Sequence, residues 1–156
     1  MSWIAAASQA CLEAALNADI VQEMTAAERY LRLGQLVKQL HDPEVYRQIA
    51  LCAATALSNA TALAAEVIAL GGVPPALTRV GPGQLPAPKS FEEHLMEARA
   101  ELAHYRGRLE LAKRFGVLRL QELFRVIVQS KRRHLAHAAA LASASLDPRR
   151  ESTETG

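Results

Sequence analysis

Several residues of this chain combine a chemically useful side chain with a position in the middle of a long apolar segment. Glu23 interrupts a stripe of apolar residues spaced at alternating steps of three and four, which is the repeat of one helix face. A carboxylate in such a stripe costs free energy unless it is paired or binds a metal. Asn59, Glu101, Lys131 and His134 lie near the middles of three other segments. Carboxylates and imidazoles at one height inside a helix bundle are the donors of di-iron and di-manganese centres.

Four helices must position these residues. Asp42 is a good N-cap and Pro43 suits the first helical position, so the sequence predicts a helix end near Leu40 followed at once by a second helix. Ser90-Phe91-Glu92-Glu93 has the spacing of a capping box, and glycines at 71, 72 and 116 are typical of helix ends. The predicted helices cover about residues 2–40, 43–70, 90–115 and 117–145.

The connections predict the topology. The first two helices, and the last two, are joined by almost no loop, so each pair must form an antiparallel hairpin. A helix of about 28 residues is about 42 Å long. The roughly 18 residues between the hairpins can extend about 55 Å if they are Pro-rich, so they can return along the whole bundle. That segment, residues 71–90, contains five prolines: Pro74, Pro75, Pro82, Pro86 and Pro88.

The predicted fold class is therefore all-α: a ferritin-like up-down four-helix bundle of two antiparallel hairpins joined by one long Pro-rich crossover. We expect this bundle to form one domain over residues 1–146, followed by a disordered polar tail over 147–156.

Composition indicates a cytoplasmic protein. The two cysteines, Cys11 and Cys52, have no CxxC spacing, which favours free thiols in a reducing compartment. The first ten residues lack the basic start of a signal peptide. The 18 residues between Arg47 and Glu66 carry no charge, but they contain polar residues and many alanines. We therefore interpret them as a helix face within the bundle, not as a membrane span, and expect no membrane partner.

Two short motifs resemble bacterioferritins and their rubrerythrin-like relatives. The first runs from Leu16-Asn17 through Glu23-Met24-Thr25-Ala26 to Tyr30, and the second is Leu70-Gly71-Gly72-Val73-Pro74. With the helix spacing, the resemblance covers roughly residues 12–142. It implies two irons that oxidise Fe(II), held by a Glu on the first helix, Glu-x-x-His on the second, a Glu on the third and Glu-x-x-His on the fourth.

These ligands carry over only in part. Glu23 fits the ligand of the first helix, whereas the Glu-x-x-His of the second falls on Ala56 and Asn59, which cannot replace a bridging carboxylate and an imidazole. The third-helix ligand falls near Ala98 or Glu101. The fourth-helix pair falls on Lys131 and His134, or on His134 and His137. The largest surviving set of metal ligands is therefore Glu23, Glu101, His134 and His137.

Two further spacings have a competing explanation. Glu101-x-x-His104 has metal-ligand spacing, but we expect a surface pair, because polar neighbours three residues apart are common on exposed faces. His134-x-x-His137 suits zinc or iron, yet the adjacent bases from Lys131 to Arg133 disfavour a cation, so a half-buried and a surface histidine are expected. Only Met1, Met24 and Met96 are present, so the helix-2 methionine that binds haem in bacterioferritins is missing and no haem is expected.

Three functions remain open. The first is a bacterioferritin-related protein with an incomplete di-iron site that is not a competent ferroxidase; if Lys131 faces inward, its charge can neutralise Glu23. The second is an iron- or metal-binding protein that uses the reduced ligand set, which if active would be a di-iron-type ferroxidase. The third is an interaction or scaffold protein without a metal.

The partners follow from the surface. We expect a homo-oligomer through the first two helices, because small residues allow helices to approach closely. Residues 1–66 carry a net charge of −3, whereas residues 103–137 carry nine bases and two acids. A basic face on the last helix would suit a nucleic acid or an acidic protein, although we favour a solvated helix surface that is balanced by the acidic first helix.

Overall fold

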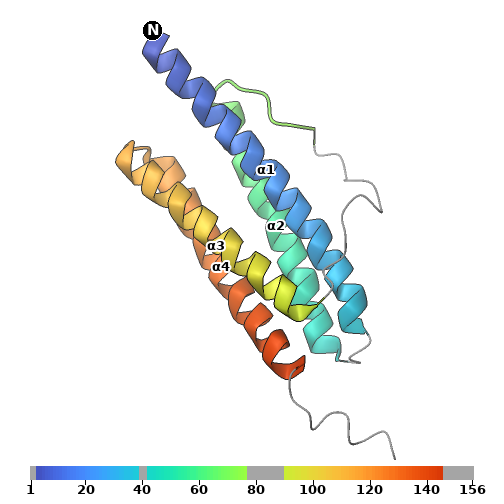
Figure 1. Ribbon diagram of the computed structural model, residues 1–156. Helices are drawn as coiled ribbons and strands as arrows, with labels where there is room; N and C mark the ends of the chain where they lie inside the picture. Colours follow the sequence, from blue (N-terminus) through green and yellow to red (C-terminus); the bar gives the residue numbers. More distant parts are fainter. Residues whose placement is uncertain (1–2, 39–41, 77–89, 146–156) are drawn as a thin grey trace, which may run out of the picture. The chain divides into compact units, whose positions relative to one another are not determined.

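The computed structural model describes residues 3–38, 42–76 and 90–145, and every element in these ranges is an α-helix. The helices are α1 (Trp3–Lys38), α2 (Pro43–Ala69), α3 (Phe91–Arg114) and α4 (Leu118–Ser145) (Figure 1). The chain divides into two compact units, Met1–Ala87 and Pro88–Gly156. The first unit is the hairpin of α1 and α2, and the second is the hairpin of α3 and α4.

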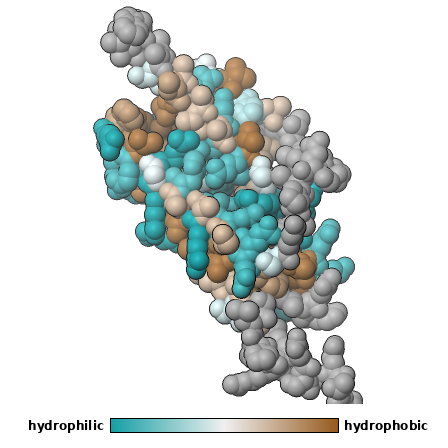
Figure 2. Space-filling view, viewed as in Figure 1, coloured by the Kyte–Doolittle hydropathy of each residue, from teal (hydrophilic) through white to brown (hydrophobic). Residues whose placement is uncertain are grey.

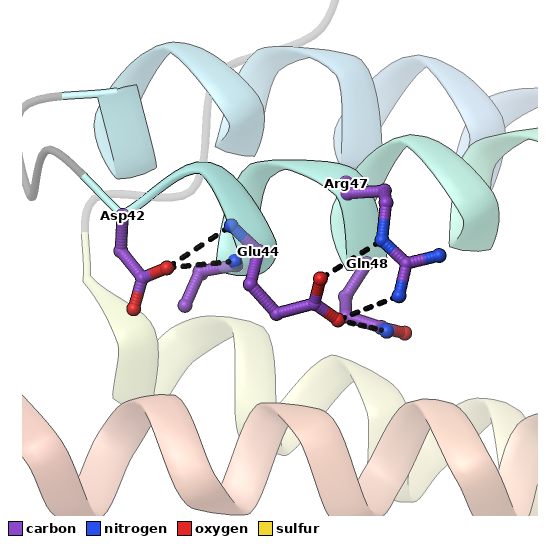
Figure 3. A network of polar contacts seen from close by, with 5 residues as sticks. Asp42, Glu44, Arg47 and Gln48 are labelled. Carbon is purple, nitrogen blue, oxygen red and sulfur yellow. Dashed lines mark hydrogen bonds and ion pairs between the residues drawn. The ribbon is translucent and has the colours of Figure 1, made fainter.

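The start of α2 confirms the predicted cap. Asp42 Oδ1 accepts hydrogen bonds from the backbone N–H groups of Glu44 (3.0 Å) and Val45 (3.4 Å), and Pro43 occupies the first turn (Figure 3). The Glu44 carboxylate then accepts from Arg47 Nη2 and from Gln48 Nε2, both at 2.7 Å. The two bonds to Asp42 satisfy backbone N–H groups that have no partner inside the helix, so the helix begins at a defined residue.

The end of α2 explains the Leu70-Gly71-Gly72-Val73 motif. Gly71 has a φ of +80°, and the N–H groups of Gly71 and Gly72 bond back to the carbonyls of Ile68 and Val67. This is the Schellman arrangement, which needs a residue that tolerates the left-handed region. A Cβ on Gly72 would lie 2.3 Å from the carboxyl carbon of Glu13.

Side chains of α1 hold this same segment. Gln9 donates to the carbonyl of Leu70, Glu13 Oε1 accepts from the N–H of Val73 at 3.2 Å, and Asn17 Nδ2 donates to the Val73 carbonyl at 3.3 Å. The three α1 residues are spaced by four, so they share one helix face. The motif is therefore the place where α1 fixes the end of α2.

The second hairpin has equally clear ends. Ser90 Oγ accepts from the N–H of Glu93 at 3.1 Å, as the predicted capping box requires. Gly116 has a φ of +69°, and the N–H of Val117 bonds to the carbonyl of Ala112, which closes α3 with a second Schellman arrangement. Gln121 Nε2 also donates to the Ala112 carbonyl, so α4 contributes to the same cap.

The buried residues follow the predicted stripes. In the first hairpin they include Leu16, Ile20, Tyr30 and Val37 of α1, and Ile49, Cys52, Ala56, Leu63 and Val67 of α2. In the second they include Ala98, Leu102 and Tyr105 of α3, and Leu120, Phe124, Ile127 and Ala138 of α4. Apolar residues at the helix ends, such as Phe91 and Leu70, are half-buried.

Two predictions fall on other parts of the chain. The crossover prediction concerns residues 71–90, of which 77–89 lie outside the described residues. The tail prediction concerns residues 147–156, which also lie outside them. The single-domain prediction for residues 1–146 stays a prediction.

Among the described helices, α2 alone is long and apolar enough to cross a membrane by length and composition. In this structure 44% of its apolar window is buried inside the protein. A core helix of a bundle passes the same test, and the buried stripe of α2 identifies it as one.

Candidate polar core sites

Each hairpin buries a carboxylate near its middle. Glu23 of α1 has no exposed surface, and Glu101 of α3 is 5% exposed. Glu101 was expected to form a surface pair with His104. This is wrong for Glu101, because it lies on the buried face of α3 together with Ala98 and Leu102. A buried carboxylate needs hydrogen-bond donors, and the two hairpins supply different ones.

In the first hairpin the donor is a neutral amide. Asn59 of α2 is buried, and its Nδ2 donates to Glu23 Oε2 at 3.0 Å. Ala56, the other position where the resemblance implies a ligand, is fully buried and carries no donor atom on its side chain. Asp19, one helical turn before Glu23, is also buried. Sequence reasoning missed Asp19, although its spacing of four from Glu23 places both on one face.

In the second hairpin the donor is an ammonium group. Lys131 of α4 is 1% exposed, and its Nζ lies 2.9 Å from Glu101 Oε2 as both a hydrogen bond and an ion pair. The same Nζ lies 5.6 Å from the centre of the buried Tyr105 ring, within the range of a cation–π contact. The Tyr105 ring is in turn packed against Phe124, with ring centres 6.2 Å apart.

His134 lies one turn after Lys131 and is also buried. Burial, together with the positive charge of Lys131, lowers the pKa of His134 from its ordinary 6.5 to about 4, although the nearby Glu101 acts in the opposite direction. The imidazole is therefore neutral at pH 7. His137 is half-buried, so the expected half-buried and surface positions of the two histidines are both shifted inward.

The sequence left open which residues of α4 are buried, and the structure shows that Lys131 and His134 both are. Ser130 is buried as well, and its Oγ donates to the carbonyl of Ile127. Lys131 takes Glu101 as its carboxylate within the hairpin, and the predicted pairing with Glu23 stays a prediction. Sequence reasoning missed the contact between Lys131 and Tyr105, although Glu101 and Tyr105 are four residues apart on α3.

Among the described residues, no group of three or more His, Cys, Asp or Glu side chains has the arrangement of a metal site.

Comparison with known proteins places this fold. No protein-family model and no curated protein sequence matches the chain. The structure is similar to the bacterioferritin of Desulfovibrio desulfuricans, whose di-iron site was described in different catalytic states. That similarity has a TM-score of 0.76 at 20% identity and covers 91% of this chain and 85% of that chain.

A second similar structure is the bacterioferritin of Rhodobacter capsulatus, which was described with a metal-free dinuclear site and a haem iron. Its TM-score is 0.72 at 20% identity, and it covers 90% of this chain and 89% of that chain. The predicted fold class is confirmed: this chain has the all-α four-helix-bundle fold of the bacterioferritins.

Proposed function

We propose that this chain is a ferritin-like bundle that stabilises its buried carboxylates with protein donors instead of iron, and that it is not a ferroxidase. The observation that carries the proposal is the buried ion pair between Lys131 Nζ and Glu101 Oε2 at 2.9 Å. A cation of the protein itself already lies against Glu101, which is one of the two third-helix positions where the resemblance places a metal ligand.

Electrostatics oppose a metal at Glu101 while that pair persists. Two unit charges 4 Å apart interact by about 4 kcal/mol at an effective dielectric constant near 20. A divalent ion sharing Glu101 with the ammonium of Lys131 would therefore be repelled by roughly 8 kcal/mol. The pair would have to break first, and the lysine side chain is enclosed by the protein, with 1% of its side-chain surface exposed.

The first hairpin supports the same proposal. Asn59 donates to Glu23 with a neutral amide, at the position where the resemblance implies an imidazole that binds the metal. At Ala56 the bridging carboxylate that the resemblance implies has no counterpart. The residues present thus do not fit a di-iron centre, and no step of iron oxidation is assigned to them.

A metal site with the reduced set Glu23, Glu101, His134 and His137 is the alternative. It has two carboxylates and two imidazoles, which is a reasonable donor set for one transition metal. It requires Lys131 to leave Glu101, and the half-buried His137 to turn toward the other donors. The ion pair therefore favours the metal-free protein over this alternative.

We further infer that the protein forms a homo-oligomer through the outer face of α1 and α2 and works as a scaffold in the cytoplasm. The outer face of α2 carries no charge from Gln48 to Ala65. Large apolar side chains on these two helices are about half exposed: Val21, Leu31, Tyr46, Leu51, Leu57 and Ile68. Several exposed large apolar side chains on two packed helices are typical of a protein–protein contact.

Metal analysis of the purified protein tests the main proposal. Protein from iron-supplemented cells should contain Fe, Mn and Zn far below one atom per chain. Lys131→Glu is the matched gain-of-binding variant, because it removes the ammonium and adds a carboxylate one turn from His134, beside Glu101 in the same hairpin. Stoichiometric metal in the original chain would overturn the proposed metal-free core.

Light scattering tests the proposed homo-oligomer. A molecular mass equal to that of one chain would overturn it.

A further inference from the structure

The turn between α3 and α4 exposes large apolar side chains. Phe115, which begins the three-residue connection 115–117, is 75% exposed, and Leu118, the first residue of α4, is 71% exposed. Leu111, one turn earlier on α3, is 41% exposed. Single exposed apolar residues are common on proteins, but three large ones gathered at one tight turn are not explained by chance exposure.

Basic residues surround this apolar tip. Residues 103–125 contain six bases and only two acids, Glu110 and Glu122, which gives a net charge of +4. One of the bases, Lys113, forms an ion pair with Glu110 at 2.7 Å. The exposed bases are Arg106, Lys113, Arg114, Arg119 and Arg125. In Figure 2, strongly hydrophobic and strongly hydrophilic residues lie side by side at the end where α3 turns into α4.

Six of the ten bases of this hairpin lie within residues 103–125, and the exposed Arg132 and Arg133 lie further along α4. The first turns of α3, residues 91–101, carry four glutamates against Arg99. The end of α4 after Arg133 has no charged residue up to Ser145. Basic charge and exposed apolar surface thus coincide at the turn, while the start of α3 is acidic.

We propose that the α3–α4 turn binds the surface of an anionic phospholipid membrane, with Phe115 and Leu118 entering the headgroup region and the surrounding arginines contacting lipid phosphates. Cationic and apolar side chains together are what such a surface recognises, since each basic residue near it contributes about 1 kcal/mol. This differs from the absence of a membrane partner expected from the sequence, which considered only a spanning segment. It does not depend on the metal content of the core.

The backbone of the turn suits this role. A backbone N–H without a partner is costly in an apolar environment. Here the N–H groups of Phe115, Gly116 and Val117 all bond to carbonyls of α3, at distances of 3.0 to 3.1 Å. These three N–H groups therefore need no water partner in the interface, and the bonds hold the turn in a fixed conformation.

A nucleic acid is the main competing partner for a basic surface. Phosphate contacts need the arginines but gain little from an exposed phenylalanine and leucine that lie beside them. The apolar contribution thus distinguishes the two partners, and it favours lipid.

Vesicle sedimentation with the full chain tests the proposal. The probes are vesicles of phosphatidylcholine alone and vesicles of phosphatidylcholine mixed equally with phosphatidylglycerol. We expect binding to the anionic vesicles only, weakening as salt increases. The double substitution Phe115→Ser with Leu118→Ser should weaken binding at least ~10-fold, because each apolar side chain loses its burial. Arg114→Gln with Arg119→Gln should weaken it ~30-fold.

Matched controls separate the turn from net charge. Arg132→Gln with Arg133→Gln removes the same charge from an exposed site about 20 Å further along α4, and Val126→Ser removes an exposed apolar side chain away from the turn. Both controls should bind within about twofold of the original chain. The two arginines lie more than a Debye length from the turn, and Val126 does not belong to the turn.

Three results would overturn the proposal: no binding to anionic vesicles, equal losses in the controls and the turn variants, or tight binding of duplex DNA that survives the Phe115 and Leu118 substitutions. A fall in solution mass caused by those two substitutions would also overturn it, because the turn would then be a contact between copies of this chain. Circular dichroism of each variant verifies that the helices remain intact.

Discussion

The two hairpins bury their central carboxylates with different kinds of donor. In the first, the amide of Asn59 donates to Glu23 at 3.0 Å; in the second, the ammonium of Lys131 donates to Glu101 at 2.9 Å. An amide satisfies an oxygen but brings no charge, whereas an ammonium brings a full positive charge into the core. The second hairpin should therefore depend more strongly on its pair than the first.

Under the proposed metal-free core, the comparison also separates two kinds of residue that stand at the ligand positions implied by the resemblance. Ala56 and Asn59 fill the space of two implied ligands with small neutral groups, whereas Lys131 supplies a permanent cation. The neutral groups of Ala56 and Asn59 only lower the affinity for a metal ion, whereas the cation of Lys131 repels it. We regard Lys131 as the residue that commits the bundle to a metal-free core.

The largest expected effect comes from breaking the charged pair. Lys131→Met leaves Glu101 buried without its cation and should cost about 3–5 kcal/mol in urea unfolding. Adding Glu101→Leu should restore most of that loss, because apolar replacement of both members of a buried pair is often neutral or stabilising. Lys113→Met, which breaks the exposed pair with Glu110, is the control and should cost less than about 1 kcal/mol. Additive losses at 131 and 101 would contradict the pair.

A pH effect comes next and concerns His134 of the second hairpin. The pKa of His134 is about 4 in the folded protein and near 6.5 when it is unfolded. The unfolded state therefore binds the proton more readily, so stability is complete above pH 6.5 and is lost as the pH falls toward 4. The loss should reach about 3 kcal/mol.

The measurement for His134 is the difference between two stability curves, because other groups also titrate in this range. Urea unfolding of the original chain and of His134→Leu should diverge between pH 6.5 and pH 4, with the variant less sensitive to pH. Parallel curves would show that His134 is accessible to protons in the folded protein.

The neutral pair should matter less. Asn59→Ala removes a hydrogen bond to a carboxylate and should cost about 2 kcal/mol of unfolding free energy. Asn17→Ala, which removes an exposed bond to the Val73 carbonyl, is the matched control and should cost less. If Asn59→Ala proves as damaging as Lys131→Met, the contrast between the hairpins fails.

The smallest effect concerns the end of α2. Gly71→Ala forces a side chain into the left-handed region and should cost about 1 kcal/mol. Gly107→Ala is the opposite case, because Gly107 lies within α3 and a Cβ there meets nothing within 4 Å. It should stabilise the protein by about 0.5–1 kcal/mol in the same urea experiment. Equal effects at both glycines would show that backbone conformation is not the cause.

Helix ends were predictable because they depend on neighbours in the chain. Asp42, Ser90, Gly71 and Gly116 act on backbone groups within a few residues, so the helix bounds in the structure lie close to those predicted. The middle of each stripe was also predictable, since a helical repeat determines which residues share a face.

The partners of buried polar residues were not predictable, because they depend on how one helix is aligned along the other. The bond from Asn59 to Glu23 joins residues 36 apart, and the bond from Lys131 to Glu101 joins residues 30 apart. Glu101 was expected on the surface for the same reason: the register of α3 was open by one turn. Whether Glu23, Glu101, His134 and His137 ever bind a metal stays a prediction.

Metal-dependent stability is the most direct test of the central claim. The free energy of unfolding is measured in chelator and again with excess Fe(II) under anaerobic conditions, and likewise with Mn(II) and Zn(II). A metal that binds the folded protein must raise that free energy, by about 2.7 kcal/mol at a hundredfold excess over its dissociation constant. We predict no change for the original chain and a clear rise for Lys131→Glu. A rise in the original chain that disappears in Glu101→Gln would contradict a core that is held together without metal.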